Sequence, residues 1–238
     1  MPKWITSKIV DIIERTETTK SFFLQMPELT NFNFIPGQFV TLDLPISDKR
    51  QDRWRSYSIA NAPNGSNIIE LVIVKVPFGK ATTYLFEEMQ IDSEIIFKGP
   101  GGVFCLPKEI KKEIVMICTG TGVAPFRSMI NHIYNHKLDH QKLHLIFGAR
   151  KRSNILYEDE WKKLTEQNPS LRVDYALSRE EFEGYQGYVH GIYQRDYSNL
   201  AKDRVFYLCG WQNMVDEAKK GLLNLGYEES QIIEELYG

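Results

Sequence analysis

A glycine-containing loop at residues 119–125 carries residue types that suit a pyrophosphate ligand. Its sequence, Thr-Gly-Thr-Gly-Val-Ala-Pro, follows the apolar run EIVMICT and precedes a segment with helical spacing. Gly120 and Gly122 allow a tight turn and a close approach of the backbone to a ligand. Pro125 suits the first turn of a helix, where its missing N–H is not needed. The loop therefore predicts a dinucleotide site, with Thr121, Gly122 and Pro125 among its binding residues.

Basic residues follow the next two strand-like runs. LHLIFGA is followed by Arg150, Lys151 and Arg152, and the run LRVDYALS ends at Ser178, before Arg179. An NAD site commonly has an acidic residue at the second strand end to bind the ribose hydroxyl, and these residues include none. Guanidinium groups instead suit the 2'-phosphate of NADP. We expect Arg150, Ser178 and Arg179 to bind NADPH, and NADH is the alternative nucleotide. A solvated basic loop that binds no ligand would explain the same residues.

Residues 55–58, Arg-Ser-Tyr-Ser, close another strand-like run. Arg55 offers a planar guanidinium to a phosphate, and Tyr57 offers a ring to an aromatic ligand. Ser58 adds a hydroxyl that can hydrogen-bond the edge of such a ligand. A strand surface with one core tyrosine is the structural alternative for this tetrapeptide.

A second anion site is predicted at residues 79–83, Gly-Lys-Ala-Thr-Thr. Here a glycine turn opens a segment with helical spacing between Thr82 and Met89. A helix start presents backbone N–H groups to an anion, and the threonine hydroxyls lie beside them. An ordinary helix N-cap explains the same residues.

The elements that position these residues change in character near residue 105. Before it, short runs rich in Val, Ile, Phe and Thr alternate with Gly and Pro turns, which predicts a closed antiparallel barrel or sandwich. After residue 108, strand-like runs alternate with helical segments, which predicts a parallel sheet covered by helices. The expected helices are VAPFRSMINHIYNHK, YEDEWKKLTEQ and MVDEAKKGLLNLG. We expect two domains, at residues 1–105 and 108–238.

Composition excludes several classes of protein. The 238 residues hold 29 Lys and Arg against 31 Asp and Glu, so the chain lacks the basic character of a nucleic-acid binder. Three scattered cysteines, Cys105, Cys118 and Cys209, supply neither a disulfide framework nor an iron–sulfur cluster; we expect Cys105 and Cys118 to be buried and unreactive. The sequence has no signal peptide and no run long enough to span a membrane, so we expect a cytoplasmic protein.

Histidines recur every four residues at positions 132, 136, 140 and 144. On one helix they would share a face and could bind a metal. His144 belongs to the strand-like run LHLIF, however, and residues 138–141 read as a turn. We therefore expect surface histidines and no metal site.

Six segments resemble, in chain order, the ferredoxin–NADP reductase family: RSYS, GKATTYL, KGPGGVF, GTGVAP, YLCG and the terminal ELY. The resemblance implies an N-terminal six-stranded antiparallel Greek-key β-barrel that binds flavin and a C-terminal parallel α/β sandwich that binds NADP. FAD is the implied flavin, with FMN as the alternative. The C-terminal extension that clasps the adenine in some bacterial members is not expected, which leaves the holder of the adenine open.

The resemblance also assigns the flavin-binding residues. Arg55, with Ser56 beside it, would meet the pyrophosphate, Tyr57 would pack on the isoalloxazine, and Ser58 would lie near the flavin N5. Thr82 and the neighbouring amides would hold the second phosphate, and Lys75 would lie near the ribityl chain or the docking mouth. The residues of this second phosphate site are Gly79, Ala81, Thr82 and Thr83.

Four residues are implied to act in the redox step. The YLCG segment would place Cys209 beside the nicotinamide C4, where it shapes the path of the hydride. Tyr237 would lie over the flavin face. Glu235 would lie near Ser58 and Cys209 and relay a proton to the reduced flavin through Ser58.

The implied activity is hydride transfer from NADPH to FAD, followed by single-electron transfer to a separate ferredoxin or flavodoxin. Candidate docking charges for an acidic carrier are Lys49, Arg50, Arg53, Lys75 and Lys80. Two other functions stay open. One is the NAD(P)H-dependent reductase component of an oxygenase, or a flavin or ferric reductase. The other is a nucleotide-binding regulatory subunit without catalysis.

Overall fold

The computed structural model describes residues 3–237, which form two compact units. The first unit contains the described residues up to Leu106 together with Ala124–Asn135. The second contains Pro107–Val123 and the described residues from His136 onward. Each unit holds one six-stranded sheet.

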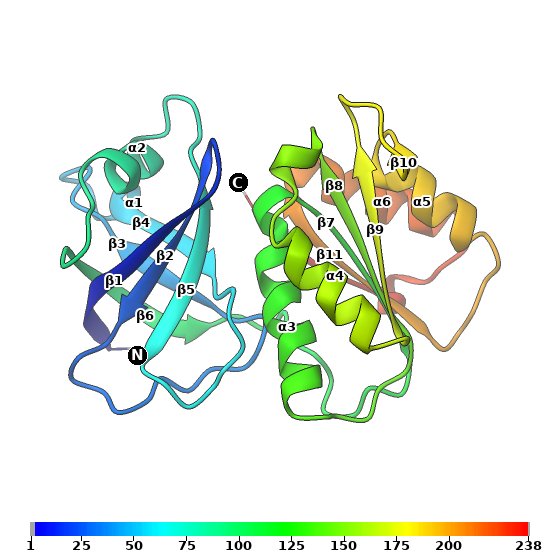
Figure 1. The fold of residues 1–238 in the computed structure, drawn as a ribbon, viewed down its shortest axis with the longest axis horizontal. Coiled ribbons are helices and arrows are strands. Elements are labelled where there is room, and N and C mark those ends of the chain that lie inside the picture. The colour runs from blue at the N-terminus through cyan, green and yellow to red at the C-terminus, as the bar shows by residue number, and fades with distance from the viewer. Residues whose placement is uncertain (1–2, 238) are drawn as a thin grey trace. The chain divides into compact units, whose positions relative to one another are not determined.

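The first unit is a closed antiparallel barrel (Figure 1). Its strands have the spatial order β4-β3-β6-β1-β2-β5. An antiparallel bridge between Ile59 and Leu71 joins the two outer strands, and the Ala60 N–H donates to the Glu70 carbonyl at 2.8 Å. The predicted barrel is therefore confirmed. The strands are β1 (Trp4–Thr16), β2 (Thr19–Gln25), β3 (Phe39–Asp43), β4 (Trp54–Ser58), β5 (Ile68–Val74) and β6 (Glu94–Gly101).

Alternating apolar side chains from these strands fill the barrel. Phe22 and Leu24 of β2, for example, are almost fully buried, as is Phe97 of β6. Two helices accompany the barrel: the single turn α1 (Arg50–Arg53) and α2 (Lys80–Glu87). Helix α2 begins two residues before the predicted start, because Gly79 rather than a threonine is the N-cap.

A buried carboxylate connects the barrel to α3 (Val123–Asn135), most of which belongs to the first unit. Glu70 on β5 is 2% exposed. It accepts hydrogen bonds from Arg15 at 2.9 Å, Ser21 at 2.6 Å and Arg127 of α3 at 2.7 Å. Ser128 of α3 donates to the Asn61 carbonyl at 2.7 Å. Two arginines thus offset a charge that would be costly to bury alone.

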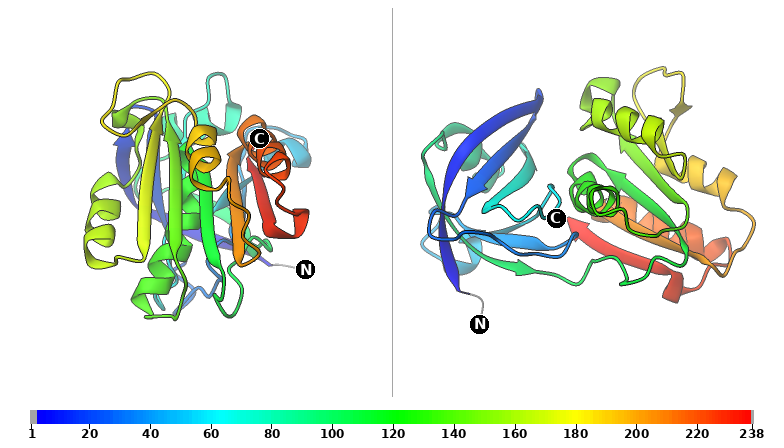
Figure 2. Two further views of the ribbon diagram at one scale, coloured as in Figure 1. Left: turned by 90° about the vertical axis from the view of Figure 1, so that its right-hand side faces the viewer. Right: turned by 60° about the horizontal axis from the view of Figure 1, so that its bottom comes forward.

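The second unit is a parallel sheet with helices on both faces (Figures 1 and 2). The spatial order is β10-β9-β8-β7-β11-β12, and all neighbouring strands are parallel, as predicted. Helices α5 and α6 pack on one face through a shared apolar core, and α4 lies on the other. The bounds are β7 (Glu113–Thr119), β8 (Leu143–Ala149), α4 (Glu158–Gln167), β9 (Leu171–Leu177), β10 (Tyr185–Gln186), α5 (Val189–Asp196), β11 (Arg204–Trp211), α6 (Gln212–Asn224) and β12 (Ile232–Tyr237).

The sequence did not predict α5 or β10. Helix α5 has eight residues, one of them Gly191, and its buried residues are Val189, Ile192 and Tyr193. That pattern is too short for periodicity to separate it from a loop. Within the described residues, no helix is long and apolar enough to cross a membrane.

Replacing Glu70 by Gln tests the buried ionic network. The variant keeps the shape of the side chain but leaves Arg15 and Arg127 without their carboxylate. We expect the free energy of unfolding to fall by about 3 kcal/mol, measured by urea unfolding followed by circular dichroism. Glu14→Gln is the matched control, because Glu14 forms an exposed pair with Lys20 at 3.6 Å. Equal effects of the two substitutions would contradict the role of the network.

Candidate functional site

The nucleotide-site residues predicted in the second unit lie at the carboxyl ends of its parallel strands, where open α/β sheets bind ligands. The glycine loop leaves β7 and forms a 3-10 turn over Gly120–Gly122. Gly120 has a φ of 54°, and a Cβ there would meet no atom within 4 Å. At Gly122 a Cβ would lie 2.4 Å from the Cys209 carbonyl oxygen. The loop therefore packs tightly against the end of β11 at Gly122 and is open at Gly120.

Thr119, the last residue of β7, adds a polar group that the sequence analysis missed. Its hydroxyl is buried and has no hydrogen-bond partner among the described residues. A Cβ on Gly210 would lie 2.9 Å from this hydroxyl, so only glycine leaves the hydroxyl its space. A buried hydroxyl without a partner is costly unless a ligand or water satisfies it. Together with the open backbone at Gly120, this donor set fits a nicotinamide nucleotide.

The predicted 2'-phosphate residues leave adjacent strand ends. The Arg179 N–H donates to the Arg150 carbonyl at 2.9 Å, and the Ser178 N–H donates to the Ala149 carbonyl at 3.1 Å. Arg150 and Arg179 are both exposed. Arg152 is instead engaged by Glu158 at 3.0 Å, so it is less suited to a phosphate.

Cys209 and Glu235 lie on neighbouring strands in the second unit. They are register partners between β11 and β12, and Cys118 on β7 is the partner of Cys209 on the other side. Burial, with a smaller contribution from the Glu235 charge, raises the pKa of Cys209 well above its usual value. The Tyr237 side chain lowers the pKa of the Cys209 thiol, but this effect is outweighed. Cys209 is therefore a neutral thiol in this unit, suited to contacts rather than to nucleophilic chemistry.

The predicted isoalloxazine site lies on β4 of the first unit. Arg55 donates through Nη1 to the carbonyls of Asp52 and Trp54, at 3.1 and 2.7 Å, which holds the guanidinium beside the strand. Tyr57 is partly buried, and burial raises its pKa to about 12, an effect that the Arg55 charge opposes. Its ring is therefore neutral and suited to stacking.

The serines that flank Tyr57 have different surroundings. Ser58 is buried at the end of β4, opposite Phe39 of β3. The exposed Ser56 has its hydroxyl 3.0 Å from the Thr41 hydroxyl of β3. Their roles toward a flavin stay predictions.

The second flavin-phosphate site is predicted at the start of α2. Thr83 donates its N–H to Gly79, so the N–H groups of Lys80, Ala81 and Thr82 precede the first bond of the helix. Such N–H groups and the helix dipole suit a phosphate. The Thr82 hydroxyl accepts from the Val76 N–H at 3.1 Å and donates to the Gly79 carbonyl at 3.2 Å, so it closes the preceding turn.

Lys75 forms an ion pair with Glu87 at 2.7 Å. That pair joins the end of β5 to the last turn of α2. A role for Lys75 beside the flavin remains a prediction. The donors on β4 and at the start of α2, guanidinium and backbone N–H, are nevertheless those that a pyrophosphate requires.

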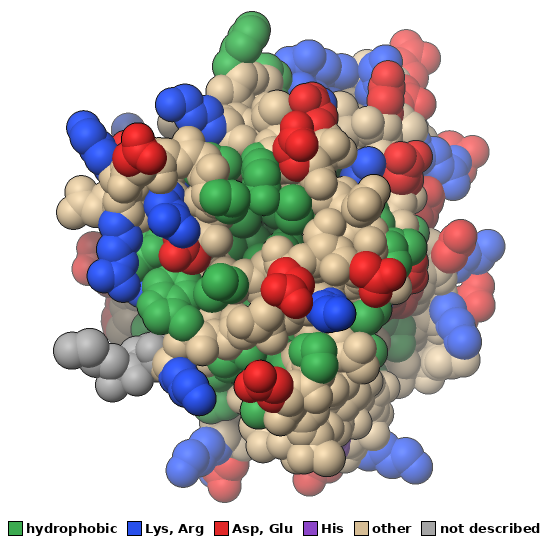
Figure 3. All heavy atoms as spheres, turned by 90° about the vertical axis from the view of Figure 1, so that its left-hand side faces the viewer, with side chains coloured by type: hydrophobic (Ala, Val, Ile, Leu, Met, Phe, Trp, Pro, Cys, Tyr) green, Lys and Arg blue, Asp and Glu red, His purple; other side chains and the backbone are tan. Residues whose placement is uncertain are grey.

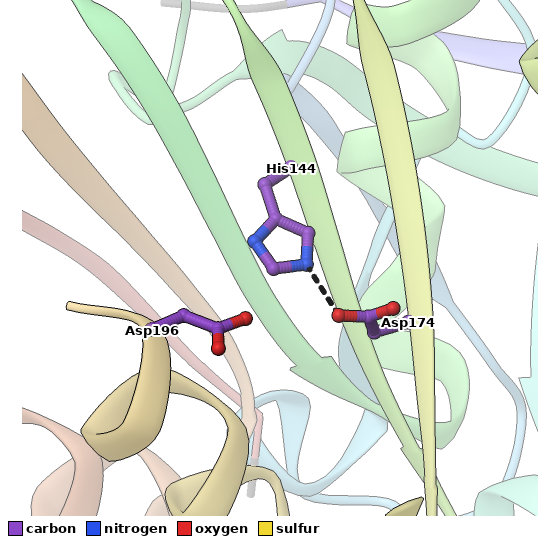
Figure 4. A group of neighbouring side chains, drawn as sticks. All are labelled: His144, Asp174 and Asp196. Carbon is purple, nitrogen blue, oxygen red and sulfur yellow. Dashed lines mark hydrogen bonds and ion pairs between the residues drawn. The ribbon is translucent and has the colours of Figure 1, made fainter. Parts of the chain in front are cut away.

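The expectation that His144 is a surface histidine is wrong. It is 2% exposed, with Nδ1 2.5 Å from the Tyr197 hydroxyl oxygen and Nε2 3.1 Å from Asp174 (Figure 4). Asp196 faces the same ring from α5 and completes a group of possible metal ligands. Arg172 pairs with both carboxylates, however, so the group forms an ion network that positive side chains already satisfy. His144 lies in β8, which is buried on both faces, and its polar partners Tyr197 and Asp174 come from other elements of the chain.

Cys105 also differs from expectation, because it is only partly buried. We expect a thiol-specific disulfide reagent at pH 8 to label Cys105 alone in the folded protein. Burial raises the pKa of both Cys118 and Cys209 well above the usual value, so neither forms a thiolate at that pH. Labelling should give one thiol per chain, none in a Cys105→Ser variant, and all three after unfolding. Rapid labelling of Cys209 in the folded chain would contradict its buried, neutral state.

Two family models match consecutive parts of the chain. Residues 7–105 match the family model of the oxidoreductase FAD-binding domain, and residues 116–220 match that of the oxidoreductase NAD-binding domain. The anthranilate 1,2-dioxygenase electron transfer component of Acinetobacter baylyi is 30% identical over 215 residues, 87% of this chain and 59% of that protein. The CDP-6-deoxy-L-threo-D-glycero-4-hexulose-3-dehydrase reductase of Yersinia pestis is 30% identical over 216 residues, 90% and 63% of the two chains. The chain spans about three fifths of the length of these relatives.

Solved structures share the whole fold. The Amycolatopsis cytochrome P450 reductase has a TM-score of 0.87 at 24% identity, with 98% of this chain and 69% of that chain covered. A ferredoxin NADP+ reductase from Neisseria gonorrhoeae has a TM-score of 0.82 at 24% identity, with 99% of both chains covered. With both domain models matched in order, the chain belongs to the FAD- and NAD-binding oxidoreductases that have the fold of the ferredoxin–NADP+ reductases.

Proposed function

We propose that this chain transfers a hydride from NADPH to bound FAD and then passes single electrons to a separate ferredoxin or flavodoxin. The observation that carries the proposal is the union of an FAD-binding and an NAD-binding oxidoreductase domain in one chain. The flavin supplies the chemistry, since it can accept two electrons together and release them one at a time. The protein supplies binding, orientation and exclusion of water.

The side chains divide this work. Arg55 and the first N–H groups of α2 bind phosphate, and the neutral Tyr57 ring stacks on the flavin. Cys209, a neutral and buried thiol, offers a nonpolar wall to the nicotinamide. Glu235 is the proton donor that the resemblance implies, and Tyr237 is the aromatic cover. The pairing of β11 with β12 supports this part of the proposal, because it places Glu235 opposite Cys209 and Tyr237 opposite Trp211.

The preference for NADPH rests on Arg150, Ser178 and Arg179. The hydrogen bond from the Arg179 N–H to the Arg150 carbonyl holds the two arginines side by side at the carboxyl ends of β8 and β9. The nearby acid Glu180 accepts a hydrogen bond from the Arg152 backbone N–H at 2.9 Å. Its carboxylate is therefore engaged by the backbone, and we do not assign it to a ribose hydroxyl. NADH is the alternative nucleotide.

The acceptor has two candidates. A ferredoxin or flavodoxin carrier is acidic in the proposal, and it would meet Lys49, Arg50, Arg53, Lys75 and Lys80. Arg53 pairs with Asp43 at 2.8 Å and Lys75 with Glu87, so their charges are partly offset. Figure 3 shows basic and acidic side chains interspersed around apolar ones on one face of the molecule.

The second candidate is the oxygenase of a multi-component system, fed directly or through its ferredoxin. It is favoured by the names of several relatives, which are electron transfer or reductase components of a dioxygenase, a phenol hydroxylase and a propane monooxygenase. A flavin or ferric reductase and a non-catalytic regulatory subunit remain further alternatives.

A cytoplasmic location is part of the proposal and agrees with the supply of NADPH.

A coupled assay with the FAD-loaded protein tests both the acceptor and the nucleotide. We expect NADPH-dependent reduction of added flavodoxin or [2Fe–2S] ferredoxin, at saturable rates and without release of flavin. The Arg150→Ala/Arg179→Ala double variant should lose about a hundredfold in kcat/KM for NADPH and little for NADH, because two charge-assisted hydrogen bonds are removed.

Arg152→Ala is the matched control, since Arg152 is held by Glu158. Its nucleotide preference should equal that of the unmodified protein. Equal losses with NADPH and NADH in the double variant would contradict the 2'-phosphate assignment. Free flavin as the only acceptor would instead identify a flavin reductase.

A further inference from the structure

An exposed phenylalanine stands beside the predicted phosphate site of α2. Phe78 lies between β5 and α2, and its side chain is fully exposed to solvent. Its φ of 62° is in the left-handed region, which side chains other than Gly and Asn avoid. The Gly79 N–H donates to the Val76 carbonyl at 3.0 Å across Pro77 and Phe78. Phe78 therefore occupies the third position of a tight turn, where a type II turn favours glycine.

This residue conflicts with local preference in two ways. A left-handed backbone disfavours phenylalanine, and the exposed ring gains nothing from burial in the protein. Backbone strain that no local interaction offsets is characteristic of positions with a function. The function must use the ring, because glycine or asparagine would satisfy the turn better.

The turn that carries Phe78 is firmly held. The Thr82 hydroxyl bonds both the Val76 N–H and the Gly79 carbonyl, which joins the turn to the first turn of α2. Ala81 and Leu85 anchor α2 in the barrel core. The loop between β5 and α2 projects at the upper end of the barrel (Figure 1). Phe78 therefore lies on a turn whose backbone is held by hydrogen bonds, next in the chain to the N–H groups of Lys80, Ala81 and Thr82.

We propose that Phe78 is the stacking platform for the adenine of FAD and selects FAD over FMN. The inference rests on the proposed function, because it requires a flavin phosphate at the start of α2. In FAD, one ribose separates the adenine from its nearest phosphate. In the chain, Phe78 is two residues before Lys80, whose N–H is the first of the α2 N–H groups that would bind that phosphate. The ring is therefore close in the chain to the phosphate site, as the adenine is close to its phosphate. Aromatic rings bind bases by stacking, with little dependence on hydrogen bonds. FMN has no adenine and gains nothing from this ring.

Flavin titration of the apoprotein, full chain, tests the inference. The variants are Phe78→Asn, which keeps the left-handed turn without a ring, and Phe78→Trp, which keeps a ring. We expect Phe78→Asn to raise the Kd for FAD about tenfold and to leave the Kd for FMN unchanged. Phe78→Trp should retain the FAD affinity. Ile91→Asn, at an exposed apolar residue just after α2, is the matched control and should change neither Kd.

The outcomes separate the two proposals. An unchanged FAD affinity in Phe78→Asn, or equal loss for FAD and FMN, would overturn the adenine platform while the flavin site stands. Unchanged flavin affinities together with a raised KM for the carrier would assign Phe78 to docking and also overturn it. Failure of the unmodified chain to bind either flavin would overturn the proposed function, and the platform with it.

Discussion

A carboxylate buried at the seam of a barrel needs positive charge, and Glu70 receives it from Arg15 and Arg127, both far away in the sequence. Its backbone closes the barrel, because its carbonyl accepts from Ala60 and its N–H donates to Asn61. The same side chain holds α3, the helix that follows the glycine loop directly. Glu70 therefore stabilises both the closure of the barrel and α3, the helix that follows the glycine loop in the chain.

The two predicted sites offer different kinds of donor to a phosphate. In the first unit, donors come from the Arg55 guanidinium and the first N–H groups of a helix fixed by the Thr82 hydroxyl. In the second unit, glycines open the backbone at the carboxyl end of a parallel sheet, and arginines stand at neighbouring strand ends. Between the nucleotide loop and β12, burial keeps the Cys209 thiol neutral.

Local patterns were enough to predict the architecture. The alternation of β2, with Phe22 and Leu24 inward, and the buried run of β7 gave the correct sheet types. Features that depend on distant residues were not predictable. Glu70 is one acid in an otherwise apolar strand, and only the fold brings Arg15 and Arg127 to it. His144 was misread for the same reason, since its partners Tyr197 and Asp174 come from other elements. The strain at Phe78 needs backbone angles that a sequence does not contain.

The proposed activity requires that this chain use a nicotinamide nucleotide to reduce its own flavin. Anaerobic stopped-flow mixing of the FAD-loaded protein with NADPH, and separately with NADH, follows the visible absorbance of the flavin in a single turnover. We expect complete bleaching by NADPH, faster than by NADH. A flavin that stays bound and oxidised with both nucleotides would contradict it.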